Sequence, residues 1–497
     1  MEYGKNSWRQ AGVALAAFAA TAALLFLGKG LMPRWPLMWF APLPVLLFAL
    51  RRPAWQAGLV AGGAWLVGGL NLWSYLRVVG VPRLGWLSGF GTEAAVFAAG
   101  VLLTRALAKR GAVWTAWMAL PALWAGFEYV SNLTTPNGSA GATAYSQLNF
   151  LPFLQTASLA GPWGMSFVMM LFPTGLALAI HLWSGKRGRA LRVLGATLGI
   201  VGALLTFGAV RLAIPQRGPE VKVGLIASDA NGGASVERPG AATEKLLEEY
   251  AAHARQLIAQ GAQVVVMPEH LGVIPDSDVA QVDGIFQPIA DQTGAVLVVG
   301  VARVGASGRH NQARIYAPDT AVRTYDKEHL LPPFETSRFT PGTKRLDFDA
   351  PGTASRPGAG ETWGVAICKD MDFTEPARSY GRAGVGLMLV PAWDFNVDGF
   401  WHGHIAVMRA VEDGFSLVRS ARNGLLTVAD DRGRIRAERA SSAAPFAMLL
   451  AEVPAGHQGT LFQMLGDWFG WGALLLLALV LGRLWVVSRA RSEVNAR

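Results

Sequence analysis

Cysteine is almost absent from this 497-residue chain, because Cys368 is its only one. A single cysteine cannot form an intramolecular disulfide or a cysteine-rich metal site, which leaves packing, chance or nucleophilic chemistry for the thiol. A buried free cysteine usually acts as a small hydrophobic side chain. The residues that accompany Cys368 must therefore decide between these readings.

Charged residues are also scarce, at 16% of the chain, whereas hydrophobic residues make up 52% and there are 18 tryptophans. This composition is typical of a membrane protein. Long apolar runs lie in residues 1–215 and about 464–487, and the stretch between them holds most of the aspartate and glutamate. The chain is therefore expected to consist of a membrane region, a water-soluble domain and a final membrane helix.

Seven segments before residue 215 reach or approach the roughly 20 apolar residues that a membrane-spanning helix needs. We expect spans near residues 11–28, 35–50, 54–76, 85–107, 112–131, 161–183 and 193–210. An eighth span is expected over Leu461–Val487. The first is read as an uncleaved helix rather than a signal peptide because further spans follow it. The domains predicted are thus a seven-helix membrane region (1–215), a water-soluble domain (216–457), and an eighth helix with its tail (458–497).

The connections between these spans differ in basic residues: one side carries eleven lysines and arginines and the other five. Cytoplasmic loops are the more basic ones, so the N-terminus and the C-terminal tail are placed in the cytoplasm and residues 216–457 outside it. A cytoplasmic (inner) membrane is therefore the expected location. The cytoplasmic loops also account for most of the net charge of +10, and no basic run interleaved with aromatics points to nucleic acid. Anionic lipid headgroups are a better partner for this charge.

Strand-like and helical patterns alternate within residues 219–455, which indicates an α/β domain with an extensive sheet. Helices are expected over residues 241–259 and 401–413, and a hairpin over 313–326. Further strands are expected over residues 221–226, 263–267, 295–303, 363–368, 385–390, 416–421, 424–430 and 445–453. Functional side chains in such sheets tend to lie at strand ends.

Three reactive side chains do follow strand-like runs: Glu269, Lys327 and Cys368. A thiol attacks a carbonyl well only as a thiolate, so it needs a base or a positive charge nearby. Glu269 can supply the base, and Lys327 can stabilise an oxyanion and help to keep Cys368 ionised. Each has an ordinary alternative, Glu269 as a cap or loop carboxylate and Lys327 as a surface lysine. Their joint occurrence in this order favours a catalytic site.

At these residues the sequence resembles the nitrilase superfamily, whose Glu-Lys-Cys triad occurs in this order at the ends of neighbouring strands. The resemblance extends to the motifs Tyr325–Glu335, Phe339–Gly342 and Asp370–Arg378. Together with the membrane spans, and with Tyr145–Gln147 and Gly161–Phe167, the chain resembles the bacterial apolipoprotein N-acyltransferases over nearly its whole length. The resemblance implies an αββα sandwich attached to a multi-span helical membrane bundle.

The resemblance further implies roles for six residues of this sequence. Glu269 would be the general base, Lys327 the oxyanion stabiliser and Cys368 the nucleophile. Glu335 would match the second glutamate of the family, Asp370 would support the site, and Trp393 would match an aromatic position at the substrate. A capping or solvated glutamate and a core tryptophan remain the alternatives for Glu335 and Trp393, and His404 is read as structural.

The implied reaction is a two-step acyl transfer. Cys368 takes an acyl chain from a phospholipid and passes it to the N-terminal amine of a diacylglyceryl-cysteine apolipoprotein. It needs no metal or organic cofactor, and the protein is expected to act as a monomer.

Three features depart from the family. Lys369 and Asp370 replace tyrosine and glutamate after the nucleophile, and Ala227-Ser-Asp229 replaces Gln-Gly-Asn. The stretch between Lys327 and Cys368 is also short. Two alternatives therefore stay open, a membrane-tethered nitrilase-type amidase (carbon-nitrogen hydrolase) and a divergent acyltransferase with another amine acceptor. A third, a transporter with an inactive enzyme domain, has only Glu93 and Glu128 away from helix ends to support it.

Overall fold

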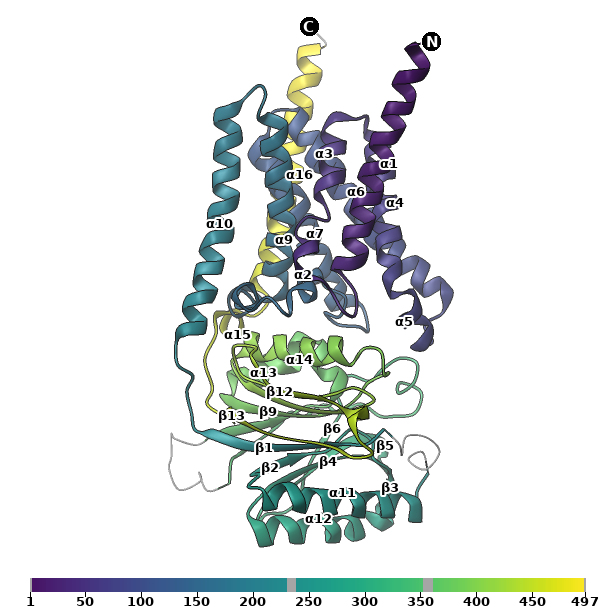
Figure 1. The fold of residues 1–497 in the computed structure, drawn as a ribbon, viewed down its shortest axis with the longest axis vertical. Helices are drawn as coiled ribbons and strands as arrows, with labels where there is room; N and C mark the ends of the chain where they lie inside the picture. The colour runs from purple at the N-terminus through teal and green to yellow at the C-terminus, as the bar shows by residue number, and fades with distance from the viewer. Residues whose placement is uncertain (1, 230–237, 352–360, 496–497) are drawn as a thin grey trace. The chain divides into compact units, whose positions relative to one another are not determined.

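The computed structural model of the chain describes residues 2–229, 238–351 and 361–495. Its internal contacts divide the chain into two compact units. A helical unit comprises Met1–Thr134, Gly141–Arg211 and Asp467–Arg497, and an α/β unit comprises Leu212–Gly466 with the short segment Thr135–Ala140. The predicted combination of a helical region and an α/β domain is confirmed. Figure 1 follows the two units along the chain by colour.

The helical unit is built from long apolar helices separated by short connections. Helix α4 packs against α1 and α6, and α7 packs against α6, α9 and α16. Its helices are α1 (Glu2–Gly28), α2 (Trp35–Met38), α3 (Leu43–Arg51), α4 (Ala54–Gly69), α5 (Trp73–Val78), α6 (Arg83–Lys109), α7 (Val113–Thr134), α8 (Leu151–Leu154), α9 (Ala157–Leu182), α10 (Arg187–Ala213) and α16 (Trp468–Asn495), with 3₁₀ turns at Leu70–Leu72 and Thr143–Gln147.

Among the described residues, six helices are long and apolar enough to cross a membrane: Arg9–Gly28, Ala54–Val78, Arg83–Lys109, Ala157–Leu182, Arg187–Ala213 and Trp468–Arg489. The expected span over residues 35–50 is shorter, because prolines divide it into α2 and α3. The expected span over residues 112–131 is helix α7, which falls outside the six and carries Pro121, Glu128 and several tryptophans. The count of eight spans therefore stays a prediction.

The last long helix begins later than its sequence suggested. The expected span from Leu461 is interrupted at Gly466, whose φ of +65° is a conformation that residues with a Cβ rarely adopt. A short helix α15 (Leu461–Leu465) precedes this break and α16 follows it.

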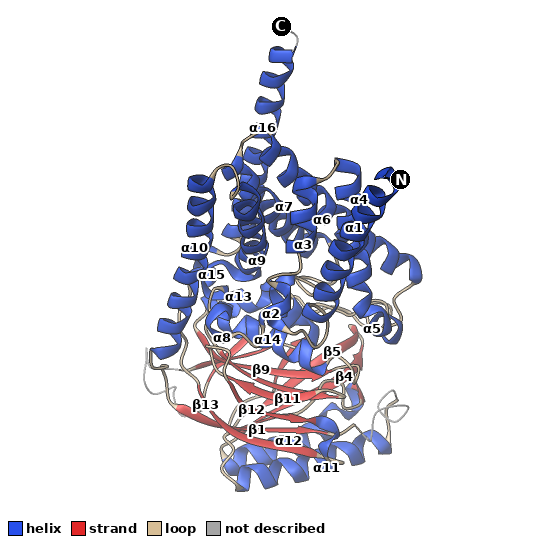
Figure 2. Ribbon diagram, turned by 45° about the horizontal axis from the view of Figure 1, so that its top comes forward, coloured by secondary structure: helices blue, strands red, loops and turns tan. Residues whose placement is uncertain are grey.

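The α/β unit contains two sheets with helices on their outer faces (Figure 2). Its helices are α11 (Ala241–Ala259), α12 (Val279–Thr293), α13 (Thr374–Arg382), α14 (Gly399–Asp413) and α15, with 3₁₀ turns at Asp276–Asp278, Cys368–Asp372 and Ser441–Ala443. Its strands are β1 (Glu220–Ala227), β2 (Val264–Val266), β3 (Val273–Pro275), β4 (Val296–Gly305), β5 (Gly308–Tyr316), β6 (Arg323–Asp326), β7 (Leu346–Asp349), β8 (Thr362–Val365), β9 (Val385–Trp393), β10 (Ser416–Arg422), β11 (Leu425–Ala429), β12 (Ile435–Ala440) and β13 (Ala447–Pro454).

The first sheet has the order β13-β1-β2-β4-β5-β6, with β3 paired to β4, and the second has the order β12-β11-β10-β9-β8-β7. Both have parallel pairs at their centres, β1-β2-β4 and β8-β9-β10. The strands outside them are antiparallel, apart from β3, which pairs parallel with β4. Parallel strands are typically buried on both faces. The carboxyl ends of β2 and β8 therefore lie in the interior of the unit, where Glu269 and Cys368 follow them.

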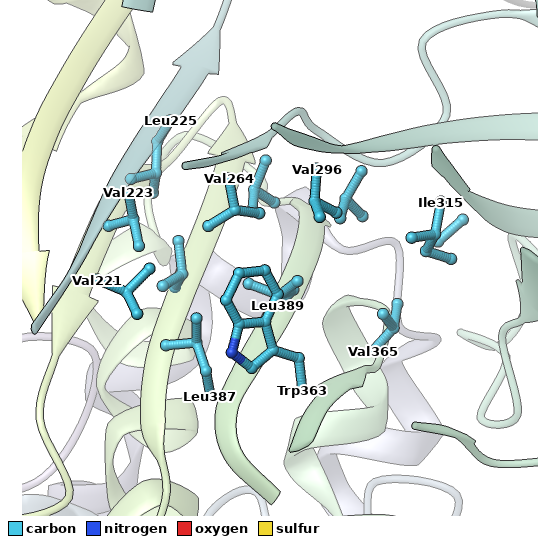
Figure 3. Close-up of a cluster of buried hydrophobic side chains, with 14 of the residues drawn as sticks. Val221, Val223, Leu225, Val264, Val296, Ile315, Trp363, Val365, Leu387 and Leu389 are labelled. Carbon is cyan, nitrogen blue, oxygen red and sulfur yellow. The ribbon is translucent and has the colours of Figure 1, made fainter. Parts of the chain in front are cut away.

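Three apolar cores hold these layers together. The central core lies between the sheets, where Val223, Leu225 and Val264 face Trp363 and Leu389 (Figure 3). A second core joins the first sheet to α11 and α12, and a third joins the second sheet to α13 and α14. This is the predicted αββα arrangement.

Several elements were missed in the sequence, for physical reasons. Helix α12 contains Gly284 and Pro288, which obscure its helical period. Strand β12 reads Ile-Arg-Ala-Glu-Arg-Ala and is exposed along most of its length, so it lacks the apolar alternation of a strand with one buried face. The short strands β3 and β7 and helix α13 were also not predicted.

Candidate functional site

Glu269 reaches its position through a close approach of two backbone segments. It follows strand β2 by three residues, and its N–H donates to the carbonyl of Ala392 at 3.3 Å. Gly300 on strand β4 lies directly beneath this segment. A Cβ at residue 300 would meet the carbonyl oxygen of Pro268 at 2.3 Å and the Cα of Glu269 at 2.7 Å. Glycine at this position therefore lets the carboxylate sit against the sheet.

Lys327 lies between two carboxylates at the end of strand β6. Its Nζ is 2.7 Å from Oε1 of Glu269 and 2.8 Å from Oε2 of Glu335, and its side chain is 2% exposed. The side-chain amide of Asn311, on the adjacent strand β5, donates to Glu269 at 2.5 Å and to Glu335 at 2.6 Å. One cation and one amide thus hold both carboxylates in fixed positions.

The two carboxylates have opposite pKa shifts. Burial raises the pKa of Glu269, and the nearby Glu335 adds to the increase while Lys327 opposes it. Burial would also raise the pKa of Glu335, but the charge and hydrogen bond of Lys327, together with hydrogen bonds from Leu331 and Asn311, outweigh it and lower that pKa. Such pairs separate a permanent anion from a group that exchanges protons. Glu335 therefore has the pKa shift of a carboxylate that stays ionised, and Glu269 has the shift of one that can accept a proton.

One oxygen of Glu269 remains available for proton transfer. Its Oε1 accepts from Lys327 and Asn311, whereas its Oε2 is buried and has no hydrogen-bond partner in the described part of the chain. An unpartnered buried carboxylate oxygen is costly in a folded protein and calls for a functional reason.

Cys368 occupies a tight turn after strand β8. Its φ is +46°, a left-handed conformation that is uncommon for a residue with a Cβ and frequent at functional sites. The Sγ atom lies 3.6 Å from the carbonyl oxygen of Trp393 on strand β9, to which the thiol donates. The chain thus presents the sulfur at the end of a central parallel strand.

The thiol of Cys368 keeps its proton in the resting protein. The residue is partly accessible but is surrounded by protein, and this burial raises its pKa well above the ordinary value, with Glu269 adding to the increase. Lys327 and Arg419 act in the opposite direction without cancelling it. Lys327 lowers the pKa of the thiol, in the expected direction, but burial and the Glu269 carboxylate raise that pKa more. A base must remove this proton during attack.

Asp370 braces the turn that carries the thiol. Its fully buried carboxylate accepts from the Tyr325 hydroxyl at 2.8 Å, the backbone N–H of His329 at 2.8 Å and the backbone N–H of Ile367 at 3.0 Å. These bonds join strand β6, the segment after it and the cysteine turn. Its expected role as a supporting residue stays a prediction.

The other residues singled out in the sequence lie as follows. Trp393 is half-buried at the end of β9, with the Arg422 guanidinium 3.8 Å from its ring centre. Lys369 does not point to solvent but is buried, with Nζ 3.6 Å from Asp372. His404 on α14 pairs with Glu438 through Nε2 at 3.0 Å, which agrees with a structural role.

The strands that carry these residues are not all neighbours. Strands β4 and β5 lie between β2 and β6 in the first sheet, and β8 belongs to the second sheet. The expectation of neighbouring strands is wrong for Glu269, Lys327 and Cys368. The site lies where the two sheets meet, and the loops that follow the strands bring the three side chains together.

Buried ion pairs next to the thiol were not foreseen. Arg419 binds Asp394 through two bonds of 2.9 and 2.6 Å, and both side chains are fully buried. His402 contacts Asp372 at 3.2 Å and Asp398 at 3.3 Å. Although burial opposes it, these two carboxylates raise the pKa of His402 to about 10. Nothing local in the sequence signals such pairs, because their partners are 4 to 30 positions apart.

Asn311 was also missed. It lies within strand β5 (Gly308–Tyr316), two residues before the expected hairpin over 313–326, so no predicted element drew attention to it. Ser139 was missed as well: it belongs to the segment assigned to the α/β unit, and its hydroxyl donates to the carbonyl of Asp372 at 2.6 Å. Within the described ranges no group of three or more histidine, cysteine or acidic side chains is arranged to hold a metal ion.

Comparison with known proteins agrees with this architecture. Residues 21–175 match the family model described as apolipoprotein N-acyltransferase N-terminal domain, and residues 234–463 match the one described as carbon-nitrogen hydrolase. An apolipoprotein N-acyltransferase of Geobacter metallireducens is 28% identical over 501 residues, covering 93% of each chain. Another from Rhizobium meliloti is 27% identical and covers 85% of this chain and 83% of its own.

Among solved structures, an amidase from Nesterenkonia sp. is 22% identical with a TM-score of 0.39, covering 52% of this chain and 97% of that one. The two family models together span most of the chain, and the curated relatives match it nearly end to end. The chain is therefore similar to the apolipoprotein N-acyltransferases along nearly its whole length, and the family model that matches most of its α/β unit is that of the carbon-nitrogen hydrolases.

Proposed function

We propose that this protein is an N-acyltransferase of lipoprotein maturation in a bacterial inner membrane. It moves an acyl chain from a phospholipid, through a thioester on Cys368, to the N-terminal amine of a diacylglyceryl-cysteine apolipoprotein. The observation that carries the mechanism is the buried Lys327 shared by Glu269 and Glu335 and electrostatically coupled to the one thiol of the chain. The relatives named apolipoprotein N-acyltransferase, matched along both units, support the choice of substrates.

The first step forms the acyl-enzyme. Oε2 of Glu269 takes the thiol proton as the sulfur of Cys368 attacks the ester carbonyl carbon. The ammonium of Lys327 stabilises the resulting oxyanion in a site that excludes most water. Collapse breaks the ester C–O bond, and Glu269 returns the proton to the leaving glycerol oxygen, which releases a lysophospholipid and leaves a thioester.

The second step transfers the acyl group. The neutral amine of the acceptor attacks the thioester carbonyl, Glu269 takes a proton from the nitrogen, and the C–S bond breaks. The proton then returns to the sulfur, so that enzyme and amide product are both complete. Glu335 stays ionised throughout and keeps Lys327 charged and in place.

Intact-protein mass spectrometry after incubation with phospholipid tests this function. We expect one added acyl mass that hydroxylamine removes and that is absent from Cys368→Ala. Addition of a diacylated lipopeptide should discharge the adduct into an N-acyl product. Discharge into free fatty acid at the same rate with and without lipopeptide would favour a hydrolase instead. A wild-type protein that never acquires the adduct would refute the proposal.

The topology proposed from the basic residues places the catalytic domain outside the cytoplasm. The chain offers a clean test, because Cys368→Ala leaves no cysteine in it. Ser307→Cys in the α/β unit should react with a membrane-impermeant maleimide in spheroplasts, whereas Ser184→Cys, in the connection before α10, should react only after lysis. Both serines are exposed. The reverse pattern would contradict the proposed orientation.

A further inference from the structure

His270, the residue after the proposed base, is buried without a task in the mechanism above. It is 5% exposed, and its Nε2 has no hydrogen-bond partner in the part of the chain that the structure describes. Its φ is +55°, a left-handed conformation that is unfavourable for a residue with a Cβ. A buried, unpartnered ring nitrogen on a strained backbone needs a reason.

Specific bonds hold this backbone on both sides. The N–H of Leu271 donates to the carbonyl of Gly300 at 2.8 Å, and the Arg422 guanidinium donates to the His270 carbonyl at 3.2 Å. The surrounding structure therefore fixes the position of the imidazole rather than leaving it to chance.

The imidazole lies between two aromatic rings and near three cations. Phe339 and Trp393 meet it edge-on, with ring centres 5.7 and 5.8 Å away. The guanidinium of Arg309 lies over the Phe339 ring at 4.7 Å, and that of Arg422 lies over the Trp393 ring at 3.8 Å. The carbonyl of the same Trp393 accepts from the Cys368 thiol, so one residue separates His270 from the nucleophile.

These surroundings fix the charge of the imidazole. Burial lowers the pKa of His270 to about 3, and Arg309, Arg422 and Lys327 contribute to the decrease while Glu335 opposes it. The ring is therefore neutral at physiological pH and offers an N–H donor in an electropositive setting. A cationic amine would be repelled from this place, whereas an anionic oxygen would be attracted to it.

We propose that His270 binds the phosphodiester of the phospholipid acyl donor, donating from Nε2 to a phosphate oxygen beside the thiol. This inference rests on the proposed function and adds a donor-specific contact to it. In a phospholipid, one glycerol unit carries the sn-1 ester at one end and the phosphate at the other. Cys368 and His270 both contact Trp393, so the ester can lie at Cys368 while the phosphate lies at His270. The diacylglyceryl acceptor carries no phosphate. His270 thus recognises the donor in the first step and has no part in the second.

The test compares two donors that differ only in the phosphoethanolamine headgroup, which one carries and the other lacks. The rate of adduct formation on Cys368 is measured with a phosphatidylethanolamine and with a diacylglycerol of the same acyl chains, in the same detergent. His270→Leu should slow acylation by phosphatidylethanolamine about tenfold or more, the size expected for a lost hydrogen bond to a charged group, and should leave acylation by diacylglycerol nearly unchanged. His270→Gln, which keeps an N–H donor, should restore most of the phospholipid rate.

A matched control is the equally buried His404, which is 5% exposed and paired to Glu438. His404→Leu should not change the ratio of the two donor rates. Equal losses on both donors in His270→Leu, or no loss on either, would overturn the inference while leaving the proposed function intact. Absence of any adduct in the wild-type protein would instead overturn the proposed function, and the inference with it.

A measurement on the wild-type protein covers the case in which His270→Leu does not fold. A lysophospholipid should inhibit acylation by diacylglycerol more strongly than the matching monoacylglycerol does, and inorganic phosphate should be a weak competitor. Equal inhibition by the two lipids would overturn the inference.

Discussion

The two sheets of the α/β unit contribute unlike parts of the candidate site. The first sheet and the segments after it supply Glu269, Asn311, Lys327 and Glu335, joined to one another by hydrogen bonds of 2.5–2.8 Å. The second sheet supplies Cys368, whose sulfur makes one longer contact of 3.6 Å. One part is a charged, tightly bonded cluster, and the other is a neutral thiol held less closely.

This difference indicates a division of labour. Fixed charges stabilise a transition state because they need no reorganisation when charge develops. A nucleophile, by contrast, must move toward carbon as its bond forms. We therefore expect substitutions in the first sheet to change proton transfer and its pH dependence. Around the second sheet, substitutions of residues other than Cys368 itself should change mainly stability.

Lys327→Met is expected to have the largest effect. It leaves two carboxylates buried without their cation, so it should lower the free energy of unfolding by about 3–5 kcal/mol and abolish the acyl adduct. Thermal unfolding and intact mass measure the two effects. The exposed Lys344, changed to Met, is the control and should alter neither. If Lys327→Met formed the adduct at the normal rate, the charged cluster would not take part in acylation.

Glu269→Gln should come next, because it removes the base but keeps the shape of the side chain. We expect the rate of acyl-enzyme formation to fall by about 10²–10⁴. Single-turnover acylation at neutral pH measures it. A fall no larger than that of Glu335→Gln would mean that the two carboxylates do not have different roles.

Glu335→Gln sharpens the distinction through pH. The charge of Glu335 raises the pKa of Glu269, so removing that charge should lower the pKa of Glu269. The base would then stay ionised to lower pH, and the acidic limb of the acylation profile should shift to lower pH. A shift in the other direction would contradict the assignment of Glu269 as the base.

Asn311→Leu removes the amide shared by both carboxylates at similar side-chain volume. Loss of these charge-assisted bonds should slow acylation by roughly tenfold and leave the KM for phospholipid nearly unchanged, since no contact with substrate is proposed for it. Separate measurement of kcat and KM decides the point. A change confined to KM would make Asn311 a substrate contact instead.

The prediction with the smallest effect on activity concerns His402, which should affect the stability of the protein rather than acylation. Its pKa of about 10 in the folded protein lies above the ordinary 6.5, so its stabilising effect is complete below pH 6.5 and is lost as the pH rises through 10. The wild-type protein should therefore lose stability between pH 6.5 and 10, and His402→Gln should lose less over that range. Unfolding temperatures at pH 6 and 10 provide the measurement. Acylation by the variant at pH 6 should change least of all.

Much of the fold could be predicted because its signals are local. The apolar runs indicated the long helices, and the strands around residues 221–226 and 385–390 and the helix over 241–259 are found close to their expected bounds. Strand β12 and helix α12 gave no such signal, one because it is polar and the other because glycine and proline interrupt it. The prolines of α2 and α3 and the break at Gly466 also altered the expected spans.

The sequence by itself determined which reactive residues end strands: Glu269, Lys327 and Cys368 follow apolar runs that can be read along the chain. Only the tertiary structure decided what those residues contact. Asn311 and Glu335 join the cluster because sheet pairing and a loop bring them to Lys327, and the Cys368 thiol keeps its proton because burial outweighs the nearby cation. Contacts and pKa values depend on register, burial and distance between segments, and none of these is a local property of the sequence.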